Sequence, residues 1–118
     1  MKKIIHVDNS VFFRKLMKTF LEAEGFEVES FESAQEAIFS ISAGSGDMVV
    51  MGLIFSEMEG DEFLSKIVES FAGPVIVISS SMNSEKVERL IDLGARAAID
   101  KTGPWKKDLS SHLSALKE

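Results

Sequence analysis

Polar residues of several kinds follow the apolar runs of this chain, and together they could bind a metal ion or a phosphoryl group. Asp8 and Asn9 follow one such run, Ser79 ends another, and Lys101 comes shortly before the last helical segment. Carboxylate groups are ligands that Mg²⁺ prefers, and ammonium and hydroxyl groups contact phosphate oxygens. The run 48–51 ends instead in Gly52, which has no side chain. We therefore expect a site at the strand ends that lacks a reactive side chain at position 52.

The elements that must position these residues follow from the apolar pattern. Short apolar runs predict strands, and apolar residues at i, i+3, i+4 and i+7, with Ser33 and Glu36 as a capping box, predict helices. The predicted strands are 4–7, 26–31, 48–51, 75–78 and 96–100. The predicted helices are 11–24, 34–43, 61–70, 84–93 and 105–116.

Five repeats of strand and helix predict a parallel sheet with helices on both faces. The uniformly apolar runs 48–51 and 75–78 should be central, because only a strand covered on both faces is apolar throughout. Sites in open parallel sheets form beyond the carboxyl ends of the strands, where strand order reverses. We therefore expect the polar residues at the strand ends to lie together.

Composition narrows the classes of protein that remain. The 118 residues predict a single domain, 1–118, with no effector domain, and the absence of cysteine suits a reducing compartment. The formal net charge is −6, with no basic stripe interleaved with aromatics, so nucleic acid is not an expected partner. The N-terminal apolar run is too short for a signal peptide or a membrane span, which predicts a cytoplasmic protein without membrane contact.

The strand-end residues and their surroundings resemble those of the receiver domain of two-component response regulators, of the single-domain chemotaxis type (CheY-like). The resemblance covers essentially the whole chain and rests on segments 4–10, 58–60, 74–80 and 94–101. It implies a flavodoxin-like fold, a doubly wound five-stranded parallel sheet of order 2-1-3-4-5. It also implies that paired acids and an acceptor aspartate hold Mg²⁺, while a hydroxyl and a lysine contact the phosphoryl group.

Carried over position by position, the resemblance leaves only part of the receiver site. Asp8, Ser79 and Lys101 match the family pattern, whereas Asn9 replaces the second acid and Gly52 replaces the acceptor aspartate. Mg²⁺ is usually held by one or two carboxylates with waters and ligand phosphates, so a lone Asp8 beside Lys101 is a weak metal site at most. We therefore expect no phosphorylation at Gly52, no cofactor, and weak or absent Mg²⁺ binding.

The expected docking face follows from the resemblance as well. In such domains the fourth helix, fifth strand and fifth helix usually bind partners, which here implicates Trp105, Ala98 and Lys106. Ala98 stands where an aromatic switch residue is expected, and Thr102 replaces the usual proline, so the usual relay is not expected. The alternative for Trp105 is that it packs over the sheet as part of the core.

The function predicted from the sequence is a degenerate receiver that acts by protein–protein interaction with a histidine kinase, another receiver or a second copy of itself. No nucleophile–base pair is visible, so an enzyme is not expected. Two alternatives stay open: a phosphorylatable receiver with an unconventional acceptor, and a sensor that binds a small anion at Gly52 through Lys101, Ser79 and loop N–H groups. Glu57 and Glu59 could instead act there as a fixed negative charge.

Overall fold

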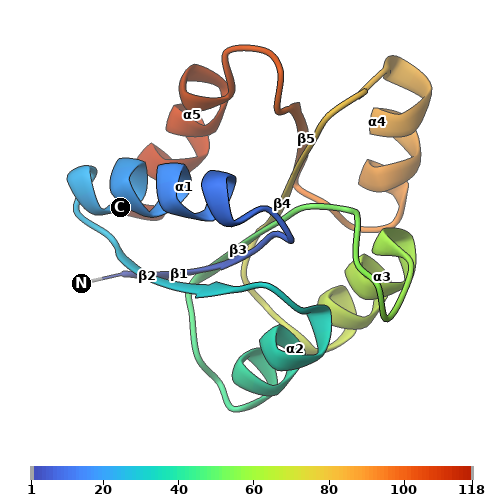
Figure 1. Ribbon diagram of the computed structural model, residues 1–118, viewed down its shortest axis with the longest axis horizontal. Helices are drawn as coiled ribbons and strands as arrows, with labels where there is room; N and C mark the ends of the chain where they lie inside the picture. Colours follow the sequence, from blue (N-terminus) through green and yellow to red (C-terminus); the bar gives the residue numbers. More distant parts are fainter. Residues whose placement is uncertain (1, 118) are drawn as a thin grey trace.

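Strands and helices alternate along the whole of residues 2–117, the part of the chain that the computed structural model describes (Figure 1). The strands are β1 (Lys3–Val7), β2 (Glu27–Phe31), β3 (Met48–Met51), β4 (Val75–Ser79) and β5 (Ala97–Asp100). The helices are α1 (Val11–Ala23), α2 (Ala34–Ser42), α3 (Gly60–Ser70), α4 (Ser84–Asp92) and α5 (Trp105–Lys117). Each boundary lies within about one residue of its predicted position, which is the scatter of helix and strand assignment itself.

The strands form one parallel sheet in the order β2-β1-β3-β4-β5, which confirms the predicted topology. β3 lies at the centre of the sheet, and all residues of β3 and β4 are buried, as their uniform apolar sequence indicates. Val7 of β1 pairs with Met51 of β3. Asp8 and Gly52 therefore leave the sheet side by side, at the point where strand order reverses.

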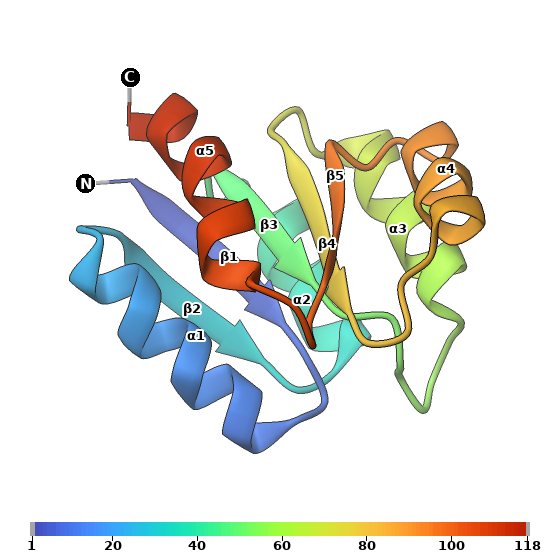
Figure 2. The same ribbon diagram turned by 90° about the horizontal axis from the view of Figure 1, so that it is seen from above.

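The helices divide into two layers, one on each face of the sheet (Figures 1 and 2). Phe13, Met17 and Leu21 of α1 pack with Leu109 and Leu113 of α5 on one face. The apolar residues of α2, α3 and α4 pack on the other face in a separate cluster. Because α1 begins and α5 begins at the carboxyl end of the sheet, these two helices frame the strand ends from one side.

Local sequence explains where the helices begin and end. The Ser10 hydroxyl accepts a hydrogen bond from the N–H of Phe13 (3.1 Å), and Ser33 does the same for Glu36 (3.1 Å). Gly25 follows α1 with a φ of +94°, a conformation that favours glycine. Only three residues separate the end of β1 from the start of α1, which brings the first turn of α1 close to Asp8.

Candidate functional site

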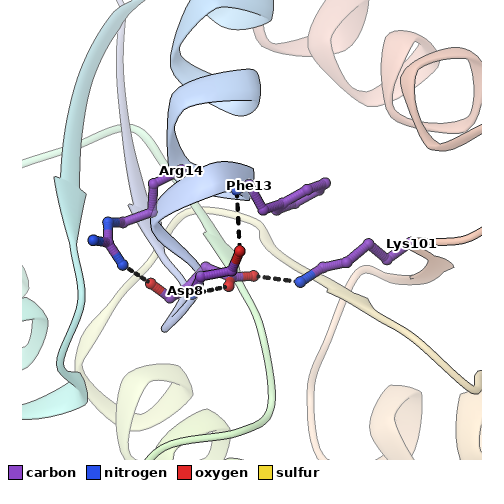
Figure 3. A network of polar contacts seen from close by, with 5 residues as sticks. Asp8, Phe13, Arg14 and Lys101 are labelled. Carbon is purple, nitrogen blue, oxygen red and sulfur yellow. Dashed lines mark hydrogen bonds and ion pairs between the residues drawn. The ribbon is translucent and has the colours of Figure 1, made fainter.

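Asp8 forms the centre of a polar network at the end of β1 (Figure 3). Its side chain is 2% exposed, and both carboxylate oxygens have partners. Oδ1 accepts the backbone N–H of Ser10 (2.8 Å), and Oδ2 accepts a hydrogen bond from Nζ of Lys101 (3.0 Å). The main-chain oxygen of Asp8 accepts Nη1 of Arg14 (2.6 Å). The expected pair of Asp8 and Lys101 is thus present, and it engages the only carboxylate at the strand ends of β1 and β3.

Lys101 is held from two sides. Its Nζ forms the ion pair with Asp8 and also lies 4.3 Å from the centroid of the Phe13 ring (Figure 3). A cation over an aromatic face is stabilised further where water is excluded, and the Lys101 side chain is only 26% exposed. Its backbone N–H donates to the main-chain oxygen of Ser79 (2.9 Å), which fixes the loop that carries it. Lys101 is therefore engaged within the protein rather than extended into solvent.

Gly52 is buried beside Asp8. Its N–H donates to the main-chain oxygen of Val7 (2.8 Å), in continuation of the sheet. A Cβ atom placed on Gly52 would lie 3.0 Å from Oδ2 of Asp8, which is closer than most real Cβ contacts. The Asp8 carboxylate therefore lies over the point from which a side chain at position 52 would start.

The other two predicted site residues, Asn9 and Ser79, lie at the same edge of the sheet, but their side chains form no hydrogen bond with Asp8 or Lys101. Asn9 is exposed. Ser79 is 6% exposed and lines a pocket of about 320 Å³ together with Gly60, Lys86 and Arg89. The structure thus brings Asp8, Gly52 and Lys101 together, and it leaves Asn9 and Ser79 at the margin.

These residues do not fit a Mg²⁺ site. Asp8 is the one carboxylate in the network, and a metal ion would have to displace Lys101 from it. Asn9 offers an amide directed to solvent, and Gly52 offers no side chain. Within residues 2–117 no group of three or more histidine, cysteine, aspartate or glutamate side chains is arranged to hold a metal.

His6 lies in β1 beneath α1, with its ring centroid 5.9 Å from that of Phe13. It is 1% exposed, and its Nδ1 atom has no hydrogen-bond partner. Burial lowers the pKa of His6 to about 4; the charge of Asp8 opposes this shift, and the smaller effects of Lys101 and Arg14 add to it. His6 is therefore a packed neutral imidazole.

Glu57 has a structural role that the sequence did not reveal. Its Oε1 accepts the backbone N–H of Ala34, the first residue of α2, and its Oε2 accepts the Ser56 hydroxyl (3.1 Å). Desolvation raises the pKa of Glu57, but these hydrogen bonds outweigh it and the net shift is downward. The carboxylate thus joins the loop after β3 to the positive end of α2, and the structure gives no support to a role as a fixed charge beside Gly52.

Trp105 is buried, as in the alternative that it packs over the sheet as part of the core. Its side chain is 9% exposed, and its ring centroid lies 5.0 Å from that of Phe13 and 5.5 Å from that of Phe20. Both ring pairs have an edge-to-face arrangement, with interplanar angles of 63° and 80°, so Trp105 packs against α1. Lys106 is exposed and Ala98 is half-buried, so a docking role for these two stays a prediction.

Phe13 is the functional residue that sequence reasoning missed. The sequence marked it only as one apolar position of an amphipathic helix, yet its ring contacts Lys101, His6 and Trp105. Its position in the first helical turn after Asp8 could have indicated this contact, because that turn must lie beside the strand ends.

Comparison with known proteins identifies the family to which this chain belongs. The family model for the response regulator receiver domain matches residues 4–113. The chain belongs to the response regulator receiver family.

Several receivers resemble it over most of their length. A chemotaxis protein CheY of Halobacterium salinarum is 31% identical over 90% of this chain and 88% of its own, and one of Treponema pallidum is 30% identical over 98% and 83%. A solved CheY-like receiver domain of Methanospirillum hungatei has a TM-score of 0.88 at 25% identity, over 99% of this chain and 94% of that one. These likenesses confirm the predicted fold and family.

Receiver domains are signalling modules of two-component systems and not enzymes. A protein-glutamate methylesterase of Syntrophomonas wolfei is 35% identical over 80% of this chain, but the match is to its receiver part and spans 28% of its length. Of the helices described, none combines the length and the apolar character needed to cross a membrane.

Proposed function

We propose that this receiver is not phosphorylated at position 52 and acts through protein–protein interaction. The observation that carries the proposal is the arrangement around Gly52. The acceptor position has no side chain, and the neighbouring carboxylate of Asp8 is paired with Lys101. Phosphoryl transfer needs a nucleophile and cations free to stabilise the transferred group, and neither is available here.

The geometry does not favour the two alternatives. A small anion bound at Gly52 would lie beside Oδ2 of Asp8, whose negative charge repels it, while Lys101 is already paired. The carboxylate beside Gly52 is that of Asp8, and attack by it on a phosphoryl group would first break the ion pair with Lys101.

The test is titration of the chain with Mg²⁺ and then with beryllofluoride, which mimics a phosphoryl group on aspartate. Trp105 is the only tryptophan and contacts Phe13, whose ring contacts Lys101, so its fluorescence reports on the site. We expect no response from the natural chain and a response from the Asn9→Asp/Gly52→Asp double variant. A saturable sub-millimolar response of the natural chain would contradict the proposal, and labelling by an acyl phosphate at a single carboxylate would do so independently.

A further inference from the structure

A polar pocket opens between α3 and α4, at the carboxyl ends of β3 and β4. Its walls come from the loop after β3, the start of α3, the end of β4 and one side of α4. Its volume of about 320 Å³ is at the lower end of the range for ligand sites, so its occupant would be a small molecule. Gly52 and Lys101 do not line it, so it is separate from the network around Asp8.

Two walls of this pocket carry opposite charges. Asp61 at the start of α3 and Arg89 of α4 bind each other, with Oδ2 and Nε 2.9 Å apart, so neither of these charges is free. Glu59 and Lys86 line the same two walls, and neither forms an ion pair with any residue of the described range 2–117. The Glu59 side chain also forms no cap hydrogen bond to α3. The pocket thus presents one unpaired carboxylate and one unpaired ammonium group.

Ser79 adds a buried hydroxyl group to the pocket. It is 6% exposed, and within residues 2–117 its Oγ atom has no hydrogen-bond partner. A buried polar group is costly to leave unpaired, and nearly all such groups in folded proteins have a partner. The Ser79 hydroxyl and the Lys86 ammonium group together offer two donors to a carboxylate. The pocket therefore has a place for the acidic group of a ligand.

Apolar side chains form the remaining wall. Ile54 lines the pocket and is 66% exposed, and Leu53 beside it is half-buried. A ligand with a short aliphatic group would remove part of this surface from water, which is favourable. The lining thus combines an acid, a base, a hydroxyl and an apolar surface in one small pocket.

We propose that this pocket binds a free α-amino acid with a small aliphatic side chain. The ligand's carboxylate pairs with Lys86 and accepts the Ser79 hydroxyl. Its ammonium group pairs with Glu59, and its side chain contacts Ile54. A simple anion would be repelled by Glu59 and a simple cation by Lys86, so a zwitterion matches the lining best. The inference goes beyond the proposed function, since it gives the interaction module a small-molecule ligand.

The test uses L-valine as the probe. It is titrated into the natural chain and followed by calorimetry and by the amide chemical shifts of residues 79–81 and 86. N-acetyl-L-valine lacks the ammonium group, L-valine amide lacks the carboxylate, and inorganic phosphate tests the pocket as a plain anion site. We expect saturable binding of L-valine with a Kd of about 1 mM or below, and binding of the other three that is about tenfold or more weaker.

Variants of the two unpaired charges locate the site. Glu59→Gln and Lys86→Gln each weaken the binding of L-valine about tenfold or more, because each removes one ion pair with the ligand. The matched controls are Glu62→Gln and Lys66→Gln, which make the same changes of charge at exposed positions of α3 outside the pocket. Both controls keep the natural affinity within about twofold, because exposed charges are screened by salt.

Ser79→Ala separates a ligand contact from a structural role. Because the hydroxyl has no partner in the fold, its removal leaves the midpoint of urea unfolding unchanged or raises it. The affinity for L-valine falls about fivefold or more in the same variant. A loss of stability with unchanged affinity would contradict the place of Ser79 in the site.

Three outcomes would overturn the inference. They are absence of saturation up to about 10 mM L-valine, binding of N-acetyl-L-valine, L-valine amide or phosphate that is as tight as that of L-valine, and natural affinity in Glu59→Gln or Lys86→Gln. The titrations contain neither Mg²⁺ nor a phosphoryl donor. Their failure would therefore leave the proposed function in place, and a beryllofluoride response would leave the pocket in place.

Discussion

The buried histidine of β1 makes the stability of this receiver depend on pH in a defined window. His6 has a pKa of about 4 in the folded protein, against 6.5 for the free side chain. Between these values the unfolded chain binds a proton that the folded protein excludes. Stability is therefore complete above pH 6.5 and is lost as the pH falls toward 4.

The size of the effect follows from the shift. Each pKa unit corresponds to about 1.4 kcal/mol, so the full loss below pH 4 is about 3 kcal/mol. Proton linkage for a single group then gives a loss of about 1 kcal/mol at pH 6 and about 2 kcal/mol at pH 5, relative to pH 7.5. Carboxylates with lowered pKa values, such as Glu29, contribute mainly below pH 5.0, because their ordinary pKa is 4.5.

The assay is urea unfolding at pH 7.5, 6.0 and 5.0, followed by Trp105 fluorescence. The variant His6→Val keeps a strand-forming apolar residue and removes the titrating group, so its stability stays nearly constant over this range. The control His112→Gln retains the loss of the natural chain, since it changes the other histidine. Equal stability of the natural chain at pH 7.5 and 5.0, or an unchanged loss in His6→Val, would refute the reasoning.

Two further substitutions test the contacts of the site. Lys101→Met leaves the buried carboxylate of Asp8 unpaired and lowers the unfolding free energy by about 2 kcal/mol, which is less than for a fully buried pair because Lys101 is partly exposed. Urea unfolding measures this loss. A variant as stable as the natural chain would show that Asp8 and Lys101 are not paired as described. Glu57→Gln removes the negative charge at the start of α2, so hydrogen exchange of the Ala34 amide becomes faster. Glu59→Gln is the control and leaves this exchange unchanged, because Glu59 forms no side-chain cap hydrogen bond. Equal exchange rates in the two variants would contradict this role of Glu57.

Much of the fold could be predicted because its signals are local. The apolar runs of β3 and β4 and the helical stripe of α1 specify their elements through hydrophobic burial alone. Hydroxyl caps at Ser10 and Ser33 fix helix starts from adjacent residues. The short connections between parallel strands and helices then leave few topologies, and the observed order is the one the resemblance implied.

The residues that form the site could also be predicted, but the contacts between their side chains could not. The sequence determined that Asp8, Gly52 and Lys101 follow strands whose ends meet, and that position 52 lacks a side chain. Only the tertiary structure decided that Phe13 holds Lys101 against Asp8, since that contact joins residues 88 positions apart in the chain. Burial of Trp105 and the bond from Glu57 to α2 were decided in the same way, by packing between helices and loops distant in sequence.

The sequence by itself determined the receiver fold and the absence of a side chain at position 52, because strand and helix periods and the identity of one residue are local properties. The tertiary structure decided which groups are paired and which surface is left exposed. Pairing and exposure depend on how α1 and α5 pack over the sheet, and that packing leaves Phe12 and Leu16 exposed on the outer side of α1.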